Sequence, residues 1–128
     1  MNPVVQTKLH IPGRQNGNCL AAAFASLLEI PIEDIPCFED MSDEKWYLEL
    51  LNWTEGLGFQ LCRWDKEMYF HGYYLVCGKS PRGNFNHIVV FQDGQMVHDP
   101  HPDGTGLELI KMTYVLIPLD PSRMITIR

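Results

Sequence analysis

Two residues of this chain have side chains that are suited to catalysis. They are a cysteine at the start of an expected helix and a histidine in an expected hairpin. Cys19 opens the apolar run CLAAAFASLLE, whose alanines and leucines predict a helix after the loop-forming residues 16–18. In the first helical turn, unpaired backbone N–H groups and the positive end of the helix dipole favour a thiolate over a thiol. Because this helix is apolar on nearly every side, we expect it to be buried and to hold Cys19 firmly.

The segment 86–100 predicts a β-hairpin whose turn is the Asp93-Gly94 pair. A two-residue loop would put His87 and His98 on one face, whereas a three-residue loop with a glycine bulge would set His87 opposite Asp99. We favour the three-residue loop, because Asp-Gly suits a type I turn that a left-handed glycine closes. An imidazole oriented by a carboxylate is half of a nucleophilic site, and a thiol is the other half.

These motifs resemble those of papain-like cysteine peptidases, in particular the compact bacterial type related to bacteriocin-leader peptidases. The shared pattern is a glutamine-containing loop, Asn-Cys before an apolar helix, a distant histidine opening a valine-rich strand, and Asp-Pro shortly after it. The resemblance covers residues 15–100. It implies a catalytic triad of Cys19, His87 and Asp99, in the chain order that the family uses.

The resemblance also implies an oxyanion donor upstream of the cysteine. Gln15 is the candidate, and Asn16 or Asn18 could supply the donor instead. The chain departs from the family pattern in three ways. Papain's own cysteine signature is missing, the histidine follows the cysteine much sooner than in full-size relatives, and the gap from Gln15 to Cys19 is short.

Length and composition indicate one globular domain, residues 1–128, of class α+β. A second helix is expected from Ser42, its cap, to the glycines at 56 and 58, with Trp46, Leu50, Trp53 and Leu57 forming one apolar stripe. Strands are expected at 4–9, 59–64, 72–77, 112–119 and 124–127, besides the hairpin, and one helical turn at 32–35. The resemblance implies a papain-like arrangement, with the cysteine-bearing helix packed on a mainly antiparallel sheet.

Charge and segment composition limit the classes of partner. A net charge of −6 and a pI near 5.2 argue against a nucleic-acid or anionic-membrane surface. We find no secretory signal and no run of membrane-spanning length, so we expect a cytoplasmic protein with four free thiols and no cofactor. The resemblance adds a bacterial or phage setting.

The expected substrate is a peptide or an amide. Arg82, in the loop before His87, could bind a substrate carboxylate or phosphate, or could belong to an ordinary solvated turn. Asn18 is a second candidate for substrate contact, and the loop 101–106 could cover the site. In the expected mechanism, the Cys19 thiolate attacks an acyl carbon, and the thioester passes to water or to an amine.

Two other functions stay open at this level. His87, His98 and His101 could provide the three protein ligands of a hydrolytic zinc site, although a zinc site leaves Cys19 unexplained and no helical zinc motif is present. The fold could also be a catalytically silent binding module, because a fold guarantees no activity.

Overall fold

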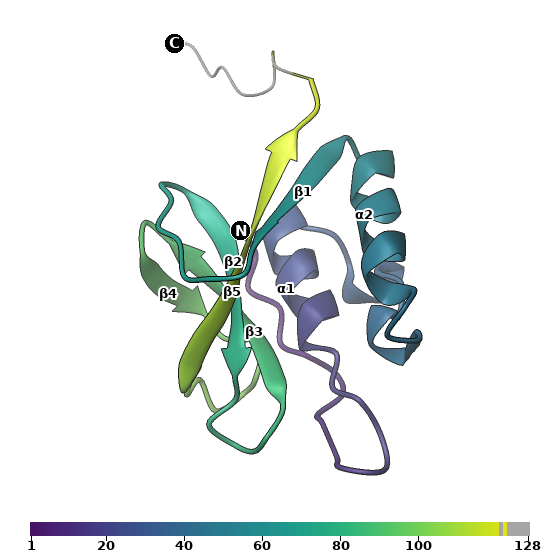
Figure 1. Cartoon of the computed structure of the whole chain (residues 1–128), viewed down its shortest axis with the longest axis vertical. Coiled ribbons are helices and arrows are strands. Elements are labelled where there is room, and N and C mark those ends of the chain that lie inside the picture. The colour runs from purple at the N-terminus through teal and green to yellow at the C-terminus, as the bar shows by residue number, and fades with distance from the viewer. Residues whose placement is uncertain (121, 123–128) are drawn as a thin grey trace.

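The computed structural model describes residues 1–120 and residue 122, and within them two α-helices precede a five-stranded sheet (Figure 1). The α+β class expected from the sequence is confirmed. The expected strand at 124–127 lies outside the described residues. The helices are α1 (Cys19–Leu28) and α2 (Trp46–Gly56), with the 3-10 turns η1 (Ile32–Asp34) and η2 (Phe38–Asp40) between them. The strands are β1 (Phe59–Trp64), β2 (Tyr73–Lys79), β3 (Asn86–Gln92), β4 (Gln95–His98) and β5 (Leu109–Pro118).

The strands lie in the order β1-β5-β2-β3-β4, and every neighbouring pair is antiparallel. Both α-helices cover the same face of this sheet: α1 packs on β3 and β2, and α2 packs on β1 (Figure 1). The main core lies between the helices and the sheet and contains Phe24, Leu50, Leu75, Val90 and Tyr114. In the described part of the chain, no helix is long and apolar enough to cross a bilayer.

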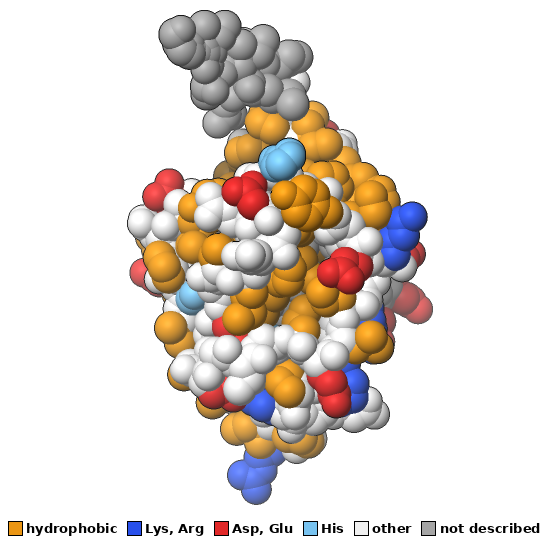
Figure 2. Space-filling view, turned by 90° about the vertical axis from the view of Figure 1, so that its left-hand side faces the viewer, with side chains coloured by type: hydrophobic (Ala, Val, Ile, Leu, Met, Phe, Trp, Pro, Cys, Tyr) orange, Lys and Arg blue, Asp and Glu red, His pale blue; other side chains and the backbone are white. Residues whose placement is uncertain are grey.

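The opposite face of the sheet carries a smaller cluster. Tyr74, Val76 and Val89 are buried there against partly buried hydrophobic side chains from β3, β5 and the loops. Figure 2 views the molecule from the side of β4 and shows hydrophobic side chains along a hollow, with acidic side chains spread around it. No continuous basic patch is visible on this face, in keeping with the net charge of −6.

Helix α1 is buried because its residues are small and apolar. Its alanines and Phe24 are at most 4% exposed, which allows the helix axis to approach β3 closely. Ser26, also buried, donates a hydrogen bond to the Ala22 carbonyl (2.7 Å) and accepts one from the Val4 N–H (2.8 Å). The helix ends at Glu29, which adopts the left-handed conformation (φ 58°).

The edge strand expected at 4–9 does not form. Instead this segment, with a bend at residues 7–8, is hydrogen-bonded to α1, to the residue before it and to the loop after β4. The Gln6 N–H donates to the Pro100 carbonyl (2.9 Å), and the Lys8 N–H donates to the Asn18 side chain (2.9 Å). Because its hydrogen bonds go to a helix start and a loop instead of one strand, the segment satisfies its backbone without a ladder.

The hairpin has the register that we did not favour. Gln92 pairs with Gln95, so the turn has two residues, and both Asp93 (φ 52°) and Gly94 (φ 86°) have positive φ. The prediction of a three-residue loop was therefore wrong. A bulge inside β4 adds the extra residue instead, since Phe91 pairs with Met96 but Val90 pairs with His98.

The bulge in β4 changes the position of Asp99 relative to His87. Without it, the two-residue turn would put His98 on the His87 face. With it, His98 pairs with Val90 instead, and Asp99 follows directly after the end of β4, with its Oδ1 atom 2.6 Å from Nε2 of His87. The carboxylate reaches the imidazole through a bulge that the turn chemistry did not reveal.

Helix α2 forms near its expected place. The backbone carbonyl of Ser42 accepts bonds from the N–H groups of Lys45 (3.0 Å) and Trp46 (3.1 Å), but the side chain does not cap the helix. Leu50 is fully buried, and Trp53 packs edge-on against Phe24 and Phe38. The apolar stripe therefore faces the core over its first three positions, whereas Leu57, the fourth, is exposed.

Candidate active site

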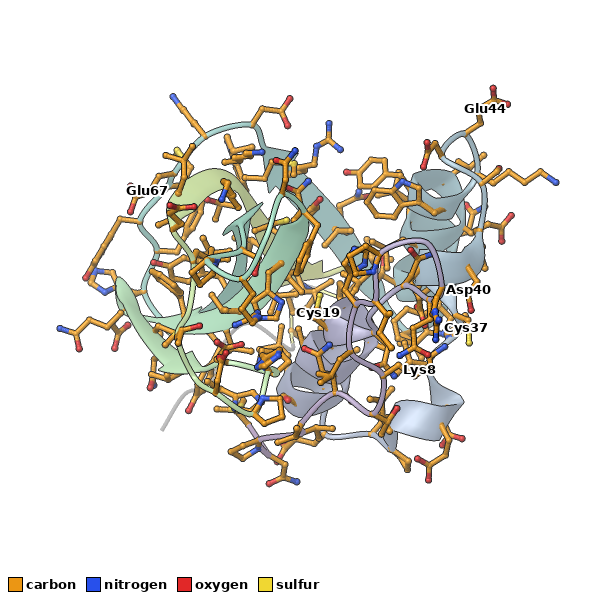
Figure 3. The ribbon with its side chains drawn as sticks, turned by 90° about the horizontal axis from the view of Figure 1, so that it is seen from below. Lys8, Cys19, Cys37, Asp40, Glu44 and Glu67 are labelled. Atoms are coloured by element: carbon orange, nitrogen blue, oxygen red, sulfur yellow. The ribbon has the colours of Figure 1, made fainter. Side chains whose placement is uncertain are left out.

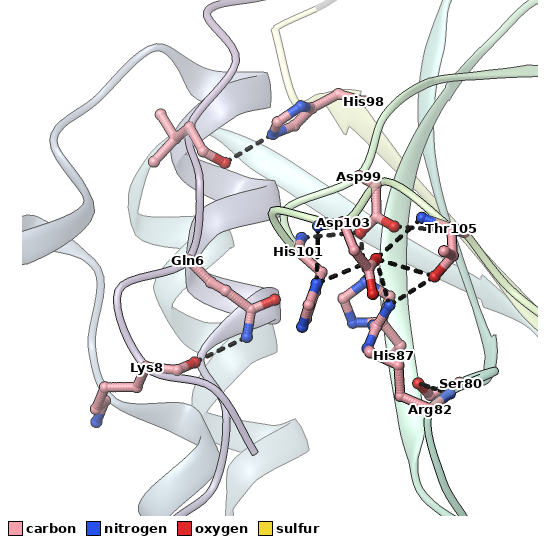
Figure 4. A network of polar contacts seen from close by, with 12 residues as sticks. Gln6, Lys8, Ser80, Arg82, His87, His98, Asp99, His101, Asp103 and Thr105 are labelled. Carbon is pink, nitrogen blue, oxygen red and sulfur yellow. Dashed lines mark hydrogen bonds and ion pairs between the residues drawn. The ribbon is translucent and has the colours of Figure 1, made fainter. Parts of the chain in front are cut away.

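Cys19, His87 and Asp99 meet where the start of α1 faces β3. The Nε2 atom of His87 lies 2.6 Å from Oδ1 of Asp99, and the side chain of Cys19 acts on the same ring and helps to raise the pKa of His87. Because Asp99 occupies Nε2, Nδ1 is the ring nitrogen left for the thiol. Figure 3 shows Cys19 between the sheet and the helices, and Figure 4 shows the Asp99 side of the network.

The electrostatics of the histidine favour the imidazolium. Burial by itself lowers the pKa of His87, but its hydrogen bonds to Asp99 and Cys19, and the charges of both, raise this pKa from 6.5 to about 9. For Asp99, burial raises the pKa, but the hydrogen bond with His87 and two backbone N–H donors lower it below the ordinary value. The structure therefore holds an ion pair at neutral pH, inside a site where His87 is only 3% exposed.

Backbone donors from the following loop fix the carboxylate. The N–H of His101 donates to Oδ1 of Asp99 (2.9 Å), and the N–H of Gly106 donates to Oδ2 (2.8 Å). Arg82 ties the same loop to the β2–β3 connection, because its Nη1 lies 2.8 Å from both Asp103 Oδ1 and Thr105 Oγ1. The loop 101–106 thus acts as a support behind Asp99 (Figure 4).

The thiol of Cys19 opens into a cleft of ≈ 820 Å³. One wall comes from the N-terminal segment, the loop before α1 and the turn η2. The other comes from the β2–β3 connection, β3 and His101. Residues of the first wall include Gln6, His10, Glu39 and Asp43, and residues of the second include Arg82, Phe85 and His87.

A smaller apolar hollow of ≈ 170 Å³ borders Cys19 and His87 on the other side. Leu20, Trp46 and Tyr114 line it, together with a second thiol, Cys77. Burial raises the pKa of Cys77 to about 12, so this thiol stays protonated. All four cysteines are free. Cys19 therefore lines both the large cleft and the small apolar hollow.

The structure does not place Gln15 at the thiol. Its side-chain amide is exposed and donates to the Leu9 carbonyl (2.7 Å). Gln15 lies in the small loop closed by the Ile11–Gln15 bridge and borders a separate hollow that excludes Cys19. The three residues between Gln15 and Cys19 are too few to turn the Gln15 amide back to the helix start while the backbone closes this bridge.

Asn18 is adjacent to the cysteine but has a structural position. Its Oδ1 accepts from the Lys8 N–H (2.9 Å), and its Nδ2 donates to Thr7 Oγ1 (2.7 Å). The residue is buried and is not among those that line the cleft. It therefore fastens the N-terminal segment to the start of α1, which leaves its carboxamide occupied.

Because Asn18 holds the N-terminal segment against the start of α1, a different glutamine, Gln6, lies at the cleft. Gln6 is 8% exposed and lines the cleft with Cys19 and His87. Its Nε2 donates to the Lys8 carbonyl (2.8 Å), and the close approach needs Gly17, because a Cβ there would lie 3.1 Å from that nitrogen. The sequence contained no local signal for Gln6, since only the fold brings it next to Cys19.

The three histidines considered for zinc do not converge. His87 is bonded to Asp99, His98 Nε2 lies 2.7 Å from the Val4 carbonyl, and the rings of His87 and His101 are 6.3 Å apart. Within residues 1–120 and 122, the group of three or more metal-competent donors that all lie within 4.8 Å of one another is that of Cys37, Glu39 and Asp40. The chemistry that the histidine site can do is therefore nucleophilic and acid–base.

Comparison of the chain with protein-family models, with curated proteins and with solved structures finds no significant match.

Proposed function

We propose that the chain is a cysteine-dependent hydrolase that cleaves a peptide or amide bond through a thioester, with a papain-like arrangement of its site. The observation that carries this proposal is the grouping of Cys19, His87 and Asp99, with His87 bonded to Asp99 at 2.6 Å and the thiol at the start of α1, in the wall of a cleft that His87 also lines. A thiol that is hydrogen-bonded to an imidazole, itself oriented by a carboxylate, is the arrangement of an activated nucleophile.

Each residue then has a role in the reaction. His87 takes the proton of Cys19 at Nδ1, so that the pair is thiolate and imidazolium, while Asp99 fixes the ring through Nε2. The thiolate attacks the carbonyl carbon, and the N–H of Cys19 at the helix start stabilises the oxyanion. His87 gives its proton to the leaving amine, and then takes a proton from the water that hydrolyses the thioester.

Two cleft residues are assigned to substrate contact. Gln6, in place of Gln15, is the side-chain candidate for a second oxyanion donor, because its amide lines the cleft with the thiol and uses only one of its two N–H groups on the Lys8 carbonyl. Arg82 lines the opposite wall and is the candidate for binding a carbonyl or carboxylate group of the substrate.

The test is the pH dependence of iodoacetamide alkylation at Cys19, read by mass spectrometry, in the wild type, in His87→Ala and in the control His71→Ala. His71 is exposed and far from the cleft. We expect rapid alkylation of Cys19 near pH 6 in the wild type and in the control. In His87→Ala we expect a rate near pH 6 that is lower by about tenfold or more, because the thiolate has lost its imidazolium.

The same samples are then given a library of fluorogenic peptide amides, with Cys19→Ala as the inactive reference. Hydrolysis that depends on Cys19 and on His87 supports the proposal. Slow alkylation with the same pH profile in wild type and His87→Ala refutes the activated pair, and leaves a cleft that only binds its ligand.

A further inference from the structure

We call the cleft wall formed by the N-terminal segment, the loop before α1 and the turn η2 the helical wall, and the wall formed by the β2–β3 connection, β3 and His101 the sheet wall. The helical wall is acidic. Glu39 lies in η2 and Asp43 lies just before α2, and both line the cleft that contains Cys19. Both also line the adjoining hollow of ≈ 210 Å³, whose other residues are mostly apolar. These two acids therefore stand where a substrate that extends from Cys19 toward α2 must pass.

Glu39 is the more constrained of the two. Its side chain is only 8% exposed, and its Oε1 atom lies 3.3 Å from the Lys8 ammonium. The same ammonium lies 3.6 Å from Asp40 Oδ2, so one cation is shared between two carboxylates (Figure 3). Two carboxylates share this ammonium, and Asp43 adds another carboxylate to the cleft lining, so carboxylates outnumber the ammonium on this wall.

The unpartnered polar atoms of the molecule point to the same place. Within the described part of the chain, three buried side-chain atoms lack a hydrogen-bond partner: Gln6 Oε1, Glu39 Oε2 and Arg82 Nη2. All three residues line the cleft. The helical wall therefore holds two unused acceptors, and the sheet wall holds one unused donor. Since a buried unpaired acceptor costs about 1–3 kcal/mol, a ligand that donates to the helical wall is favoured.

We infer that Glu39, assisted by Asp43, forms a subsite for a cationic group of the substrate, an ammonium or a guanidinium. This inference rests on the proposed function, because the subsite serves the same cleft. Lys8 already lies between Glu39 and Asp40, where a metal ion would bind, so the acceptor left for a ligand is the second oxygen of Glu39. A nitrogen cation both donates to this oxygen and offsets the excess charge.

The test uses alkylating probes that report on delivery to Cys19 without requiring turnover. A series of chloroacetamides with aminoalkyl chains of increasing length is compared with n-alkyl chloroacetamides of the same lengths. The quantity measured is the ratio of the two Cys19 alkylation rates at each chain length. A ratio cancels any change in the intrinsic reactivity of the thiol, so it isolates recognition of the cation.

In the wild type at low salt, we expect the best aminoalkyl probe to react about tenfold faster than its n-alkyl counterpart, as a charge-assisted hydrogen bond allows. In Glu39→Gln, which keeps the shape and removes the charge, we expect a ratio near one. In the control Glu44→Gln, an exposed acid away from the cleft (Figure 3), we expect the wild-type ratio.

A ratio near one in the wild type, or a tenfold ratio that persists in Glu39→Gln, overturns the inference. If Glu39→Gln does not fold, Asp43→Asn decides, because Asp43 is exposed: we expect its ratio to fall about threefold, and an unchanged ratio overturns the subsite. The rate of the neutral probe reports on the Cys19–His87 pair separately. Failure of the proposed function and failure of the cation subsite therefore give different results.

Discussion

The substitution Asp99→Asn tests the electrostatic basis of the site. Asparagine keeps the size of the side chain and one carbonyl oxygen, but it removes the charge that faces His87 at 2.6 Å. In the wild type, the pKa of His87 is about 9 because Asp99 and Cys19 outweigh burial, which acts in the opposite direction. Without the carboxylate, burial dominates, and we expect the pKa of His87 to fall by about two units or more.

The free energy involved follows from this rise in the pKa of His87. A rise from 6.5 to about 9 corresponds to about 3 kcal/mol in favour of the imidazolium, at about 1.4 kcal/mol per unit. The substitution also has a structural cost. Both oxygens of Asp99 accept backbone N–H groups, from His101 and from Gly106. An amide nitrogen in place of one oxygen would face a donor, which we expect to cost about 1–3 kcal/mol of stability.

The assay is NMR titration of the His87 ring nitrogens in the wild type and in Asp99→Asn, with Asp65→Asn as the control. Asp65 is exposed and pairs with Arg63, away from the cleft. A His87 pKa that stays near 9 in Asp99→Asn would refute the reasoning, because it would show that the carboxylate does not hold the imidazolium. We also expect Cys19 alkylation near pH 6 to fall in Asp99→Asn and to be unchanged in the control.

Three further predictions concern stability, each measured by urea unfolding. Since the pKa of His87 is raised, the stabilisation that its imidazolium gives the folded state is fully present below pH 6.5 and is lost as the pH rises through about 9. The free energy of unfolding should therefore fall across this pH window, by about 3 kcal/mol at most. In Asp99→Asn the free energy of unfolding should change less across the same window. Asn18→Ala leaves the Lys8 N–H without its acceptor and should lower the free energy of unfolding by about 2 kcal/mol. Gln15→Ala, at an exposed amide, should stay within about 0.5 kcal/mol of the wild type. Equal losses of stability in the two variants would argue against the fastening role of Asn18. Gly78→Ala would put a Cβ 1.8 Å from the Leu109 carbonyl oxygen and should lower the free energy of unfolding by about 3 kcal/mol. The control Gly56→Ala, with open space around it, should be neutral or slightly stabilising. A Gly78→Ala variant as stable as the wild type would contradict the close approach of β2 and β5.

Local patterns in the sequence were sufficient for much of the fold. Alternation in residues 59–64 predicted β1 with its observed bounds, and the apolar alanine run predicted α1 from Cys19 onward. The α+β class followed from the order of these elements. These features depend on side-chain period and on intrinsic propensity, which act between residues close together in the chain.

Other features depended on contacts that local pattern does not encode. The segment 4–9 has strand-like residues, but its partners are Asn18, Ser26 and Pro100, so it remains an extended connection without a ladder. The register of the hairpin was decided by a bulge inside β4, and neither the Asp-Gly turn nor the strand composition indicates where that bulge falls.

The candidate active site likewise combines features that local sequence determines with features that distant contacts determine. The sequence by itself determined the residue types: a cysteine at a helix start, a histidine at a strand start and an aspartate after the hairpin, because each depends on its own neighbours. Only the tertiary structure decided which groups surround them. It turned Gln15 outward, used Asn18 to fasten the N-terminal segment, and brought Gln6 and Glu39 to the walls of the cleft. The physical reason is that the side-chain amides and carboxylates of this cleft are oriented by hydrogen bonds to backbone and side-chain groups distant in the chain, and such partners become neighbours only after the helices pack on the sheet.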